Sequence, residues 1–339
     1  MGRSLTDLAY FIGVRLLELI PVLLGVILLT FFFTHVIIAD PCPAWYPHAK
    51  PPVLAACRNF FGFNQPLWVQ FEKYVVQLAQ GNWGTDQNGI PVYPVIAAAL
   101  PETVELVLAS LFIMIVFGIL LGVVAARWAG RWPDHLVRLF YLSGWAAPTY
   151  LAAVVLAFVV GPAIGLPTGG DFSVNPPPFP QPTHMSVVDA LLAGNLPFTL
   201  DAIEHLILPA TALAFLNLGI ITRMTRASML EVLPMDFVKS ARMKGLNEGT
   251  VVTRHVLRNS LISTTTVLGF TASGLLSGTI VIEEVFRWPG IGEYSYDAVV
   301  GYNFAGTIGI VIVFAIAVVV ANLIADILYG LIDPRVDWR

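Results

Sequence analysis

Apolar stretches free of Lys, Arg, Asp and Glu alternate along this chain with shorter charged segments. A helix needs about 20 apolar residues to cross the roughly 30 Å of membrane hydrocarbon, and a central Lys or Arg costs about 2.5 to 3.5 kcal/mol there. A membrane β-barrel would instead show shorter stretches of alternating polarity. The pattern therefore predicts an all-α, polytopic transmembrane helical bundle with six spans, which lie within 18–40, 105–127, 138–161, 204–223, 258–283 and 297–326.

The positive charges indicate how this bundle is oriented. With the N-terminus placed in the cytosol, 14 of the 18 Lys and Arg residues fall in cytosolic segments, an excess typical of membrane proteins. We therefore predict a multi-pass protein of the cell membrane with both termini cytosolic. The composition agrees, because 57% of the residues are hydrophobic and only 12% are charged, about half of the usual charged share.

Residues near the predicted span ends fit this threading. Pro101 suits the first turn of a helix, and Glu102 and Glu105 suit the positive end of its dipole. Arg223 and Arg226 lie at the inner end of the fourth span, where long basic side chains reach the membrane surface. We interpret both arginines as surface anchors.

The first external segment is long and has features of its own. It covers about 39–99, and the stretch 66–80 has the pattern of an amphipathic helix. The only two cysteines of the chain, Cys42 and Cys57, lie in this segment, on the side of the membrane where disulfides persist. We predict a bridge between them, which would stabilise a loop of this length by about 3 kcal/mol. Two free thiols are the alternative.

The other two external segments are shorter. The segment 162–204 contains four closely spaced prolines and no Lys or Arg, which fits either a stiff acidic lip that meets a partner or substrate, or a plain connector. After the fifth span, charged residues, interfacial aromatics and a Pro-Gly pair predict a re-entrant or interfacial turn, with Glu284, Trp288, Pro289 and Gly290 as its marker residues.

A charged cytosolic segment, 229–260, joins the fourth and fifth spans. Asp236 is a good helix N-cap, the next eight residues suit a helix, and Gly245 is placed to end that helix in a left-handed turn. Asn247 can cap a second short helix. Phe237 and Ala241, four residues apart, share one face of the first helix. Such a helix either lies on the lipid surface or docks on a cytosolic partner.

The same segment resembles the cytosolic loop of permease subunits of ABC-type importers. That motif reads Glu-Ala-Ala, three residues, Gly, and this chain has Lys239-Ser240-Ala241 and Gly245 at the same spacing. The stretches 64–67, 81–85, 284–292, 326–330 and 333–335 are similar to the dipeptide/oligopeptide branch, so the resemblance covers nearly the whole chain. It implies the first of the two permease subunits of that branch, with a type I ABC importer permease fold.

The resemblance also implies a division of work between subunits. The chain has no Gly-x-x-x-x-Gly-Lys-Ser/Thr phosphate loop, so we expect it not to be an enzyme, and ATP and Mg would be bound by two cytosolic ATPase subunits or a homodimer of one. The other expected partners are a second permease subunit, an extracytoplasmic substrate-binding protein and the lipid bilayer, with no nucleic acid. The residues expected to dock on the ATPase are Asp236, Phe237, Lys239, Ser240, Ala241, Arg242, Lys244, Gly245 and Leu246.

The substrate is less sharply implied. Di- and oligopeptides are the first expectation, and oligosaccharides, nickel or glutathione are the alternative, because relatives of this branch import them. Two departures from the family pattern bear on this: Ser263 stands where a proline is common, and the region from Cys42 to Cys57 is longer than usual. The six histidines form no ligand-spaced cluster, so we expect no metal site and no cofactor in this chain. A gradient-driven secondary transporter is a further alternative, but midplane carboxylates and an internal repeat are not visible.

The path of the substrate has two open interpretations. The fifth span is rich in small and hydroxyl residues, which either allow close helix packing, as in the spacing Gly274-x-x-x-Gly278, or line the pathway. We divide the chain into the N-terminal segment with the first span (1–38), an external loop domain (39–99) and a permease core (100–339) that holds the coupling loop 229–260. The pathway candidates, from the fourth, fifth and sixth spans, are Asn217, Thr265, Gly269, Ser273, Ser277 and Asn322.

Overall fold

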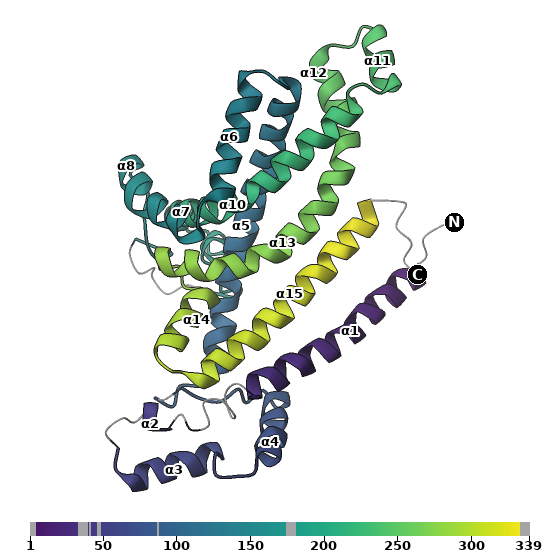
Figure 1. Cartoon of the computed structure of the whole chain (residues 1–339). Helices are drawn as coiled ribbons and strands as arrows, with labels where there is room; N and C mark the ends of the chain where they lie inside the picture. Colours follow the sequence, from purple (N-terminus) through teal and green to yellow (C-terminus); the bar gives the residue numbers. More distant parts are fainter. Residues whose placement is uncertain are drawn as a thin grey trace.

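The structure is a computed structural model that describes residues 5–32, 40, 42–45, 49–86, 88–173 and 181–332. These residues form helices joined by turns, and within the described ranges the one β-type pairing is an isolated bridge between Thr85 and Pro91. The predicted all-α class is confirmed. Figure 1 shows a tall bundle with short helices at both of its ends.

Two long helices, α5 (Val92–Arg127) and α10 (Leu196–Val232), form the centre of the bundle. α10 packs along α5 and also against α13 (Arg258–Phe286). Glycines let α5 and α10 approach closely, since a Cβ at Gly118 would stand 2.9 Å from the side chain of Ile221. The largest buried apolar cluster lies between these three helices and includes Leu106, Met114, Leu213, Ile221, Leu275 and Ile282.

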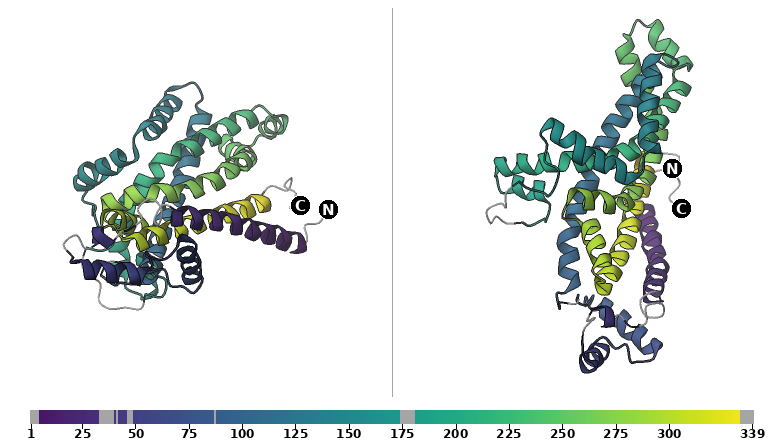
Figure 2. Two further views of the ribbon diagram at one scale, coloured as in Figure 1. Left: turned by 60° about the horizontal axis from the view of Figure 1, so that its bottom comes forward. Right: turned by 60° about the vertical axis from the view of Figure 1, so that its left-hand side comes forward.

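Two further long helices complete the bundle. α15 (Phe304–Ile332) packs against α13, and α1 (Leu5–Phe32) packs against α15. In Figures 1 and 2 the beginning of α1 and the end of α15 lie near each other, so these two helices run antiparallel. The beginning of α1 and the end of α15 therefore lie on the same side of the bundle.

The third predicted span is bent. α6 (Trp132–Ala146) is followed, after Pro148, by α7 (Thr149–Val155), the π-helical segment η2 (Leu156–Val160) and α8 (Gly161–Ile164), and the two halves meet at 111°. By length and composition, four of the described helices can cross a membrane, or five if the bent pair counts as one span. α13 has 29 residues, which at 1.5 Å per residue is about 44 Å and longer than the hydrocarbon layer. The total of six membrane spans stays a prediction.

The outer end of α5 differs from the prediction. The helix begins at Val92, after Pro91, so Pro101 lies in its interior and not in its first turn. Packing explains the extension, because Val92 and Ile96 are buried against Ile310 and other residues of α14 and α15. The burial of this apolar face offsets the hydrogen bond that a proline removes. The predicted boundary at residue 99 therefore falls inside a helix.

The described residues of the first external segment include the helices α2 (Cys42–Trp45), α3 (Pro51–Phe61) and α4 (Leu67–Ala79). α4 corresponds to the amphipathic helix expected at 66–80. A disulfide joins Cys42 to Cys57 and so ties α2 to α3. The rings of Phe31 on α1 and Phe71 on α4 are in edge-to-face contact at 5.1 Å, which attaches this segment to the first span.

Candidate functional site

The cytosolic loop contains the predicted pair of short helices. α11 (Asp236–Met243) ends before Gly245, whose φ of +77° is the left-handed conformation expected there. α12 (Glu248–Thr250) follows, and the side chain of Asn247 caps it by accepting a hydrogen bond of 2.7 Å from the Thr250 N–H. One detail differs: Met235 and not Asp236 occupies the N-cap, and Asp236 is the first residue of the helix.

The inner face of α11 packs against its own chain. Val238 and Ala241 are buried in a cluster with Val251, Val252 and Val256, which belong to the π-helical segment η3 (Val251–Leu257) at the start of α13. Phe237 and Ala241 are both among the predicted docking residues, and in this chain Ala241 is buried whereas Phe237 is exposed. Because Val238 and Ala241 are three residues apart, they define the inner face of the helix, and Ala241 lies on it.

The outer face of α11 and the turn after it is apolar at several points. Phe237 is 41% exposed, Met243 is 80% exposed and Leu246 is 40% exposed. In Figure 1 this loop stands at the far end of the bundle from the external helices α2 to α4. The remaining predicted docking residues are also exposed, and they are Asp236, Lys239, Ser240, Arg242, Lys244 and Gly245.

An ion pair closes the loop from α11 to α12. Arg242 donates hydrogen bonds of 3.1 and 2.8 Å from Nε and Nη2 to the two carboxylate oxygens of Glu248. This contact lowers the pKa of Glu248 and raises the pKa of Arg242. The bidentate pair holds the two helices at a fixed distance across the Gly245 turn.

Arg226 does not serve as a membrane-surface anchor, which corrects the prediction. It donates two hydrogen bonds to Asp134, the third residue of α6, whose side chain is fully buried. Asp134 also accepts a hydrogen bond of 2.9 Å from the Gly130 N–H. The neighbouring Arg223 is exposed and lies over the ring of Trp145 at 5.9 Å. The inner end of α10 is thus fixed to the turn before α6.

The turn after α13 is present, but its aromatic residue is not interfacial. Trp288 is completely buried and donates a hydrogen bond of 3.0 Å from Nε1 to the backbone oxygen of Glu102. Arg287 has a left-handed φ of 49°, which reverses the chain. Glu283, also buried, accepts a hydrogen bond of 2.6 Å from the Gly292 N–H at the start of α14 (Ile291–Val300). The predicted marker residues Glu284, Pro289 and Gly290 lie in or beside this turn.

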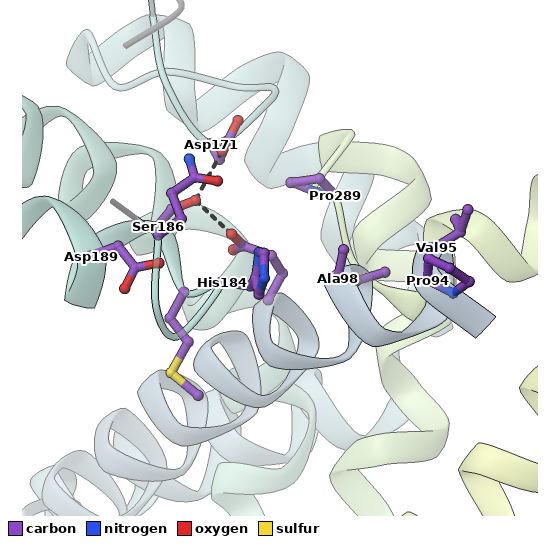
Figure 3. A pocket seen from close by; sticks show the side chains of 12 residues that line it. Pro94, Val95, Ala98, Asp171, His184, Ser186, Asp189 and Pro289 are labelled. Carbon is purple, nitrogen blue, oxygen red and sulfur yellow. Dashed lines mark hydrogen bonds between the residues drawn. The ribbon is translucent and has the colours of Figure 1, made fainter. Parts of the chain in front are cut away.

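A cavity of about 580 Å³ opens beside this turn. It lies between the outer part of α5, Asp171, residues 181–189 and Pro289, and Figure 3 shows Asp171, His184 and Ser186 around it. α9 (Ser186–Leu192) begins in its wall. The Ser186 hydroxyl lies 2.7 Å from Glu102 and 2.9 Å from Asp171. The sequence predicted only an acidic external segment here and not its contact with α5, because Glu102 and Asp171 are 69 residues apart.

Other carboxylates beside the cavity have backbone donors. Glu105 accepts hydrogen bonds of 3.2 Å from the N–H groups of Val187 and Val188. Glu102 and Glu105 were expected to favour the N-terminal end of a helix dipole. They instead bind the external segment to α5, ten and more residues from the start of that helix.

The pathway candidates are dispersed over three helices. Asn217 on α10 and Thr265 on α13 are partly buried, and each donates a hydrogen bond to the backbone oxygen four residues earlier. Asn322 is exposed on α15. Of the two glycines with small-residue spacing, Gly278 lies against Leu213, whereas Gly274 has open space around it in this chain. Gly269, Ser273 and Ser277 belong to α13, but their side chains lie outside the described part of the structure.

Comparison with known proteins gives a consistent picture. Residues 118–338 match the family model of the binding-protein-dependent transport system inner membrane component. The chain is 38% identical to a probable D,D-dipeptide transport system permease protein of Escherichia coli over 326 residues, which cover 94% of each chain. It is 36% identical to a dipeptide transport system permease protein of Alkalihalophilus pseudofirmus, with 96% and 98% covered.

Two further similarities extend this result. A glutathione transport system permease protein of Salmonella paratyphi A is 33% identical over 328 residues, with 96% of this chain and 98% of the relative covered. Among solved structures, the inward facing MetNI methionine ABC transporter superposes with a TM-score of 0.52 at 16% identity, covering 70% of this chain and 96% of the other. The latter shows that the fold is that of a type I ABC importer permease.

Proposed function

This chain belongs to the family of binding-protein-dependent transport system inner membrane components, and we propose that it carries di- or oligopeptides into the cell. The family is that of ABC importer permeases in the inner membrane, so the transmembrane role follows from the family itself. The peptide substrate is supported by permease relatives, 33 to 38% identical over most of the chain, whose names refer to dipeptide, tripeptide or oligopeptide transport.

The energy for transport would enter through the exposed face of α11. Phe237, Met243 and Leu246 are exposed apolar side chains on a loop that otherwise carries charge. A cytosolic ATPase that covers these three side chains would remove them from water, a favourable step for association. The inner face of the same helix is fixed by Val238 and Ala241. A push on the outer face therefore reaches α13 through η3 and is not lost in motion of the loop.

A second connection would pass the same motion to the other side of the bundle. α10 leads directly into the loop, and Arg226 on α10 is bound to Asp134 at the start of α6. The inner ends of α6 and α10 would then move together when two ATPase subunits close on ATP. A nucleotide shifts the balance of inward and outward states only by its differential affinity for them, which requires a firm connection of this kind.

Glutathione import is the second candidate function. It is favoured by one observation, the 33% identity to a permease of a glutathione transport system. Glutathione is itself a small peptide, so the two candidates differ in the size and linkage of the substrate and not in its chemical class. We assign the choice between them to the external segments and to the protein that delivers the substrate.

Transport into sealed vesicles tests the proposal. The vesicles would hold the complete importer with its binding protein and ATP, but no ion gradient. We expect uptake of radiolabelled dialanine that requires ATP and does not respond to an ionophore, with glutathione and maltotriose as parallel substrates. Uptake of maltotriose in place of either peptide would overturn the substrate assignment. Uptake driven by an imposed ion gradient without ATP would overturn the coupling to an ATPase.

A further inference from the structure

The external cavity is lined by carboxylates that lack enough hydrogen-bond donors. Ser186 contacts both Glu102 and Asp171, but a hydroxyl has a single proton and can donate to only one of them at a time. Figure 3 shows the two contacts as dashed lines that meet at Ser186. One of these two carboxyl groups therefore receives no hydrogen bond from Ser186, whichever way the hydroxyl turns.

Two more oxygen atoms of the cavity wall accept no hydrogen bond from any residue that the structure describes. Glu102 is 8% exposed and Asp189 is 2% exposed, and among the described residues one carboxylate oxygen of each accepts no hydrogen bond, Oε2 and Oδ2 respectively. The other Asp189 oxygen accepts from the N–H and hydroxyl of Thr183. Buried polar atoms of this kind are normally paired, and an unpaired charged oxygen costs more than a neutral one. Both residues line the cavity.

Among the described residues, no Lys or Arg lines the cavity beside these carboxylates. The segment 162–204 contains no Lys or Arg, and none lines the cavity. Of the four Lys and Arg residues outside the predicted spans on this side, Arg58 is paired with Asp40, and Arg287 is paired with Glu284 and Glu293. His184 also lines the cavity, and it is exposed. The site needs donors, and preferably positive ones, from outside the chain.

We propose that this cavity is an external binding site for a primary ammonium group and that the group is the amino terminus of the transported peptide. An ammonium has three hydrogen-bond donors and no acceptor. This matches the two unpaired oxygens of Glu102 and Asp189 and the carboxyl group to which Ser186 does not donate. The volume of about 580 Å³ lies within the range of small-molecule sites and exceeds what one lysine side chain fills. The peptide identity of the ligand rests on the proposed function, whereas the preference for an ammonium does not.

The position of the cavity suits a site of entry. Its wall includes Pro289, next to the turn where Trp288 and Glu283 join α13 to α5 and α14. If an amino terminus is bound there, the rest of the peptide, including its carboxylate, would point toward the opening, because no Lys or Arg lines the wall. The site therefore prefers peptides with a free amino end and an uncharged carboxyl end.

Equilibrium dialysis against the importer in lipid nanodiscs, without its binding protein, tests this inference. The probes are Ala-Ala-amide, which is a cation, N-acetyl-Ala-Ala-amide, which is neutral and otherwise matched, and ethylammonium chloride. We expect the cationic peptide to bind about tenfold or more tightly than the acetylated one. Glu102→Gln and Asp189→Asn should each remove most of that difference, because each replaces a carboxyl group that can bind an ammonium with an amide of nearly the same shape.

Glu72→Gln is the matched control, because Glu72 is an exposed carboxylate on the external helix α4 and does not line the cavity. It should bind all three probes as the unaltered protein does. The melting temperatures of Glu102→Gln and Asp189→Asn show whether each variant is folded. If one of them is misfolded, the other still tests the site. Equal binding of the cationic and acetylated peptides by the unaltered importer would overturn the ammonium site.

The ethylammonium probe separates this inference from the proposed function. Ethylammonium binding that depends on Glu102, in an importer that takes up no peptide, would keep the ammonium site and overturn the peptide as its source. If the variants bind the small amines normally but lose affinity for the delivering protein, the ammonium comes from a lysine of that protein and our choice of source is wrong. Peptide uptake with no dependence of any probe on Glu102 or Asp189 would overturn the site and leave the proposed function intact.

Discussion

Arg226 and Asp134, which are 92 residues apart, are joined by two hydrogen bonds of 2.8 Å each, from Nε and Nη2 of the arginine to the two carboxylate oxygens. The carboxylate side chain is fully buried, and the arginine side chain is 23% exposed. This geometry fixes the inner end of α10 to the beginning of α6. It also turns an arginine that the sequence assigned to the membrane surface into a structural connection next to the coupling loop.

Removing one partner of this pair should destabilise the protein. Asp134→Ala would leave Arg226 without its acceptor, and we expect a loss of about 2 to 4 kcal/mol, toward the lower end because the arginine keeps some access to solvent. Arg226→Lys keeps the charge but not the paired geometry and should cost less. The melting temperatures of the purified variants check this order. A melting temperature unchanged in Asp134→Ala would show that the pair does not hold the two helices.

Gly245→Val should weaken coupling to the ATPase. Gly245 has a φ of +77°, and a β-branched residue adopts this conformation at a cost of about 1 to 2 kcal/mol or more. The cost comes from the backbone alone, because nothing lies within 4 Å of the position of the added Cβ. Substrate-stimulated ATPase activity is the measurement. Gly249→Ala, in the same loop with ordinary φ, is the control and should keep normal activity.

Phe237→Asp should reduce association of the ATPase without changing membrane insertion. The side chain is 41% exposed, so a charge there is hydrated in the free permease and opposes burial against a partner. Co-purification of the ATPase with the permease measures the effect, with a loss of tenfold or more expected for about 1.4 kcal/mol. Trp68→Asp, at an exposed aromatic residue of the external helix α4, is the control. Equal co-purification of all three proteins would contradict the proposed docking surface.

The ion pair of Arg242 and Glu248 should make the stability of the folded loop depend on pH in the acid range and not near neutrality. The pKa of Glu248 is lowered from 4.5, mainly by the hydrogen bond from Arg242. A lowered folded pKa means that the ionised group stabilises the folded loop above about pH 4.5 and that this contribution is lost as the pH falls through the lowered value. Hydrogen exchange of the amides between α11 and α12 should be constant from pH 6 to 8, after correction for intrinsic rates, and faster below pH 4.5. Glu248→Gln should lack this acid step, and an acid step of equal size in that variant would contradict the assignment.

Gly292→Ala should disturb the turn that closes the external end of α13. A Cβ there would stand 2.6 Å from the Cα of Ile280 and 2.8 Å from Oε2 of Glu283. Neither can move easily, because one is backbone and the other is buried, and we expect a loss of about 1 to 3 kcal/mol. The melting temperature reports it. Gly25→Ala on α1, with nothing within 4 Å, is the control and should melt as the unaltered protein does. Identical melting of both variants would show that the turn adapts.

The sequence by itself determined the features that depend on local chemistry. Charge-free windows predicted a helical membrane protein, because charges cost too much in hydrocarbon to be placed there without a partner. Gly245, Asn247 and the helix 236–243 were found with their ends correct to within one residue, because capping and left-handed turns act over a few neighbouring residues. The family resemblance carried by the same loop agrees with the family model and the relatives.

Only the tertiary structure decided the features that join distant segments. It placed Asp134 under Arg226, extended α5 past Pro101 by burying Val92 and Ile96, and turned Ala241 toward its own chain. It also brought Glu102 to Ser186, 84 residues away, and so created the acidic cavity. Each of these side chains has an ordinary local role that the sequence suggests first. Which role prevails depends on the partner that packing supplies, and pattern along the chain contains no information about that partner.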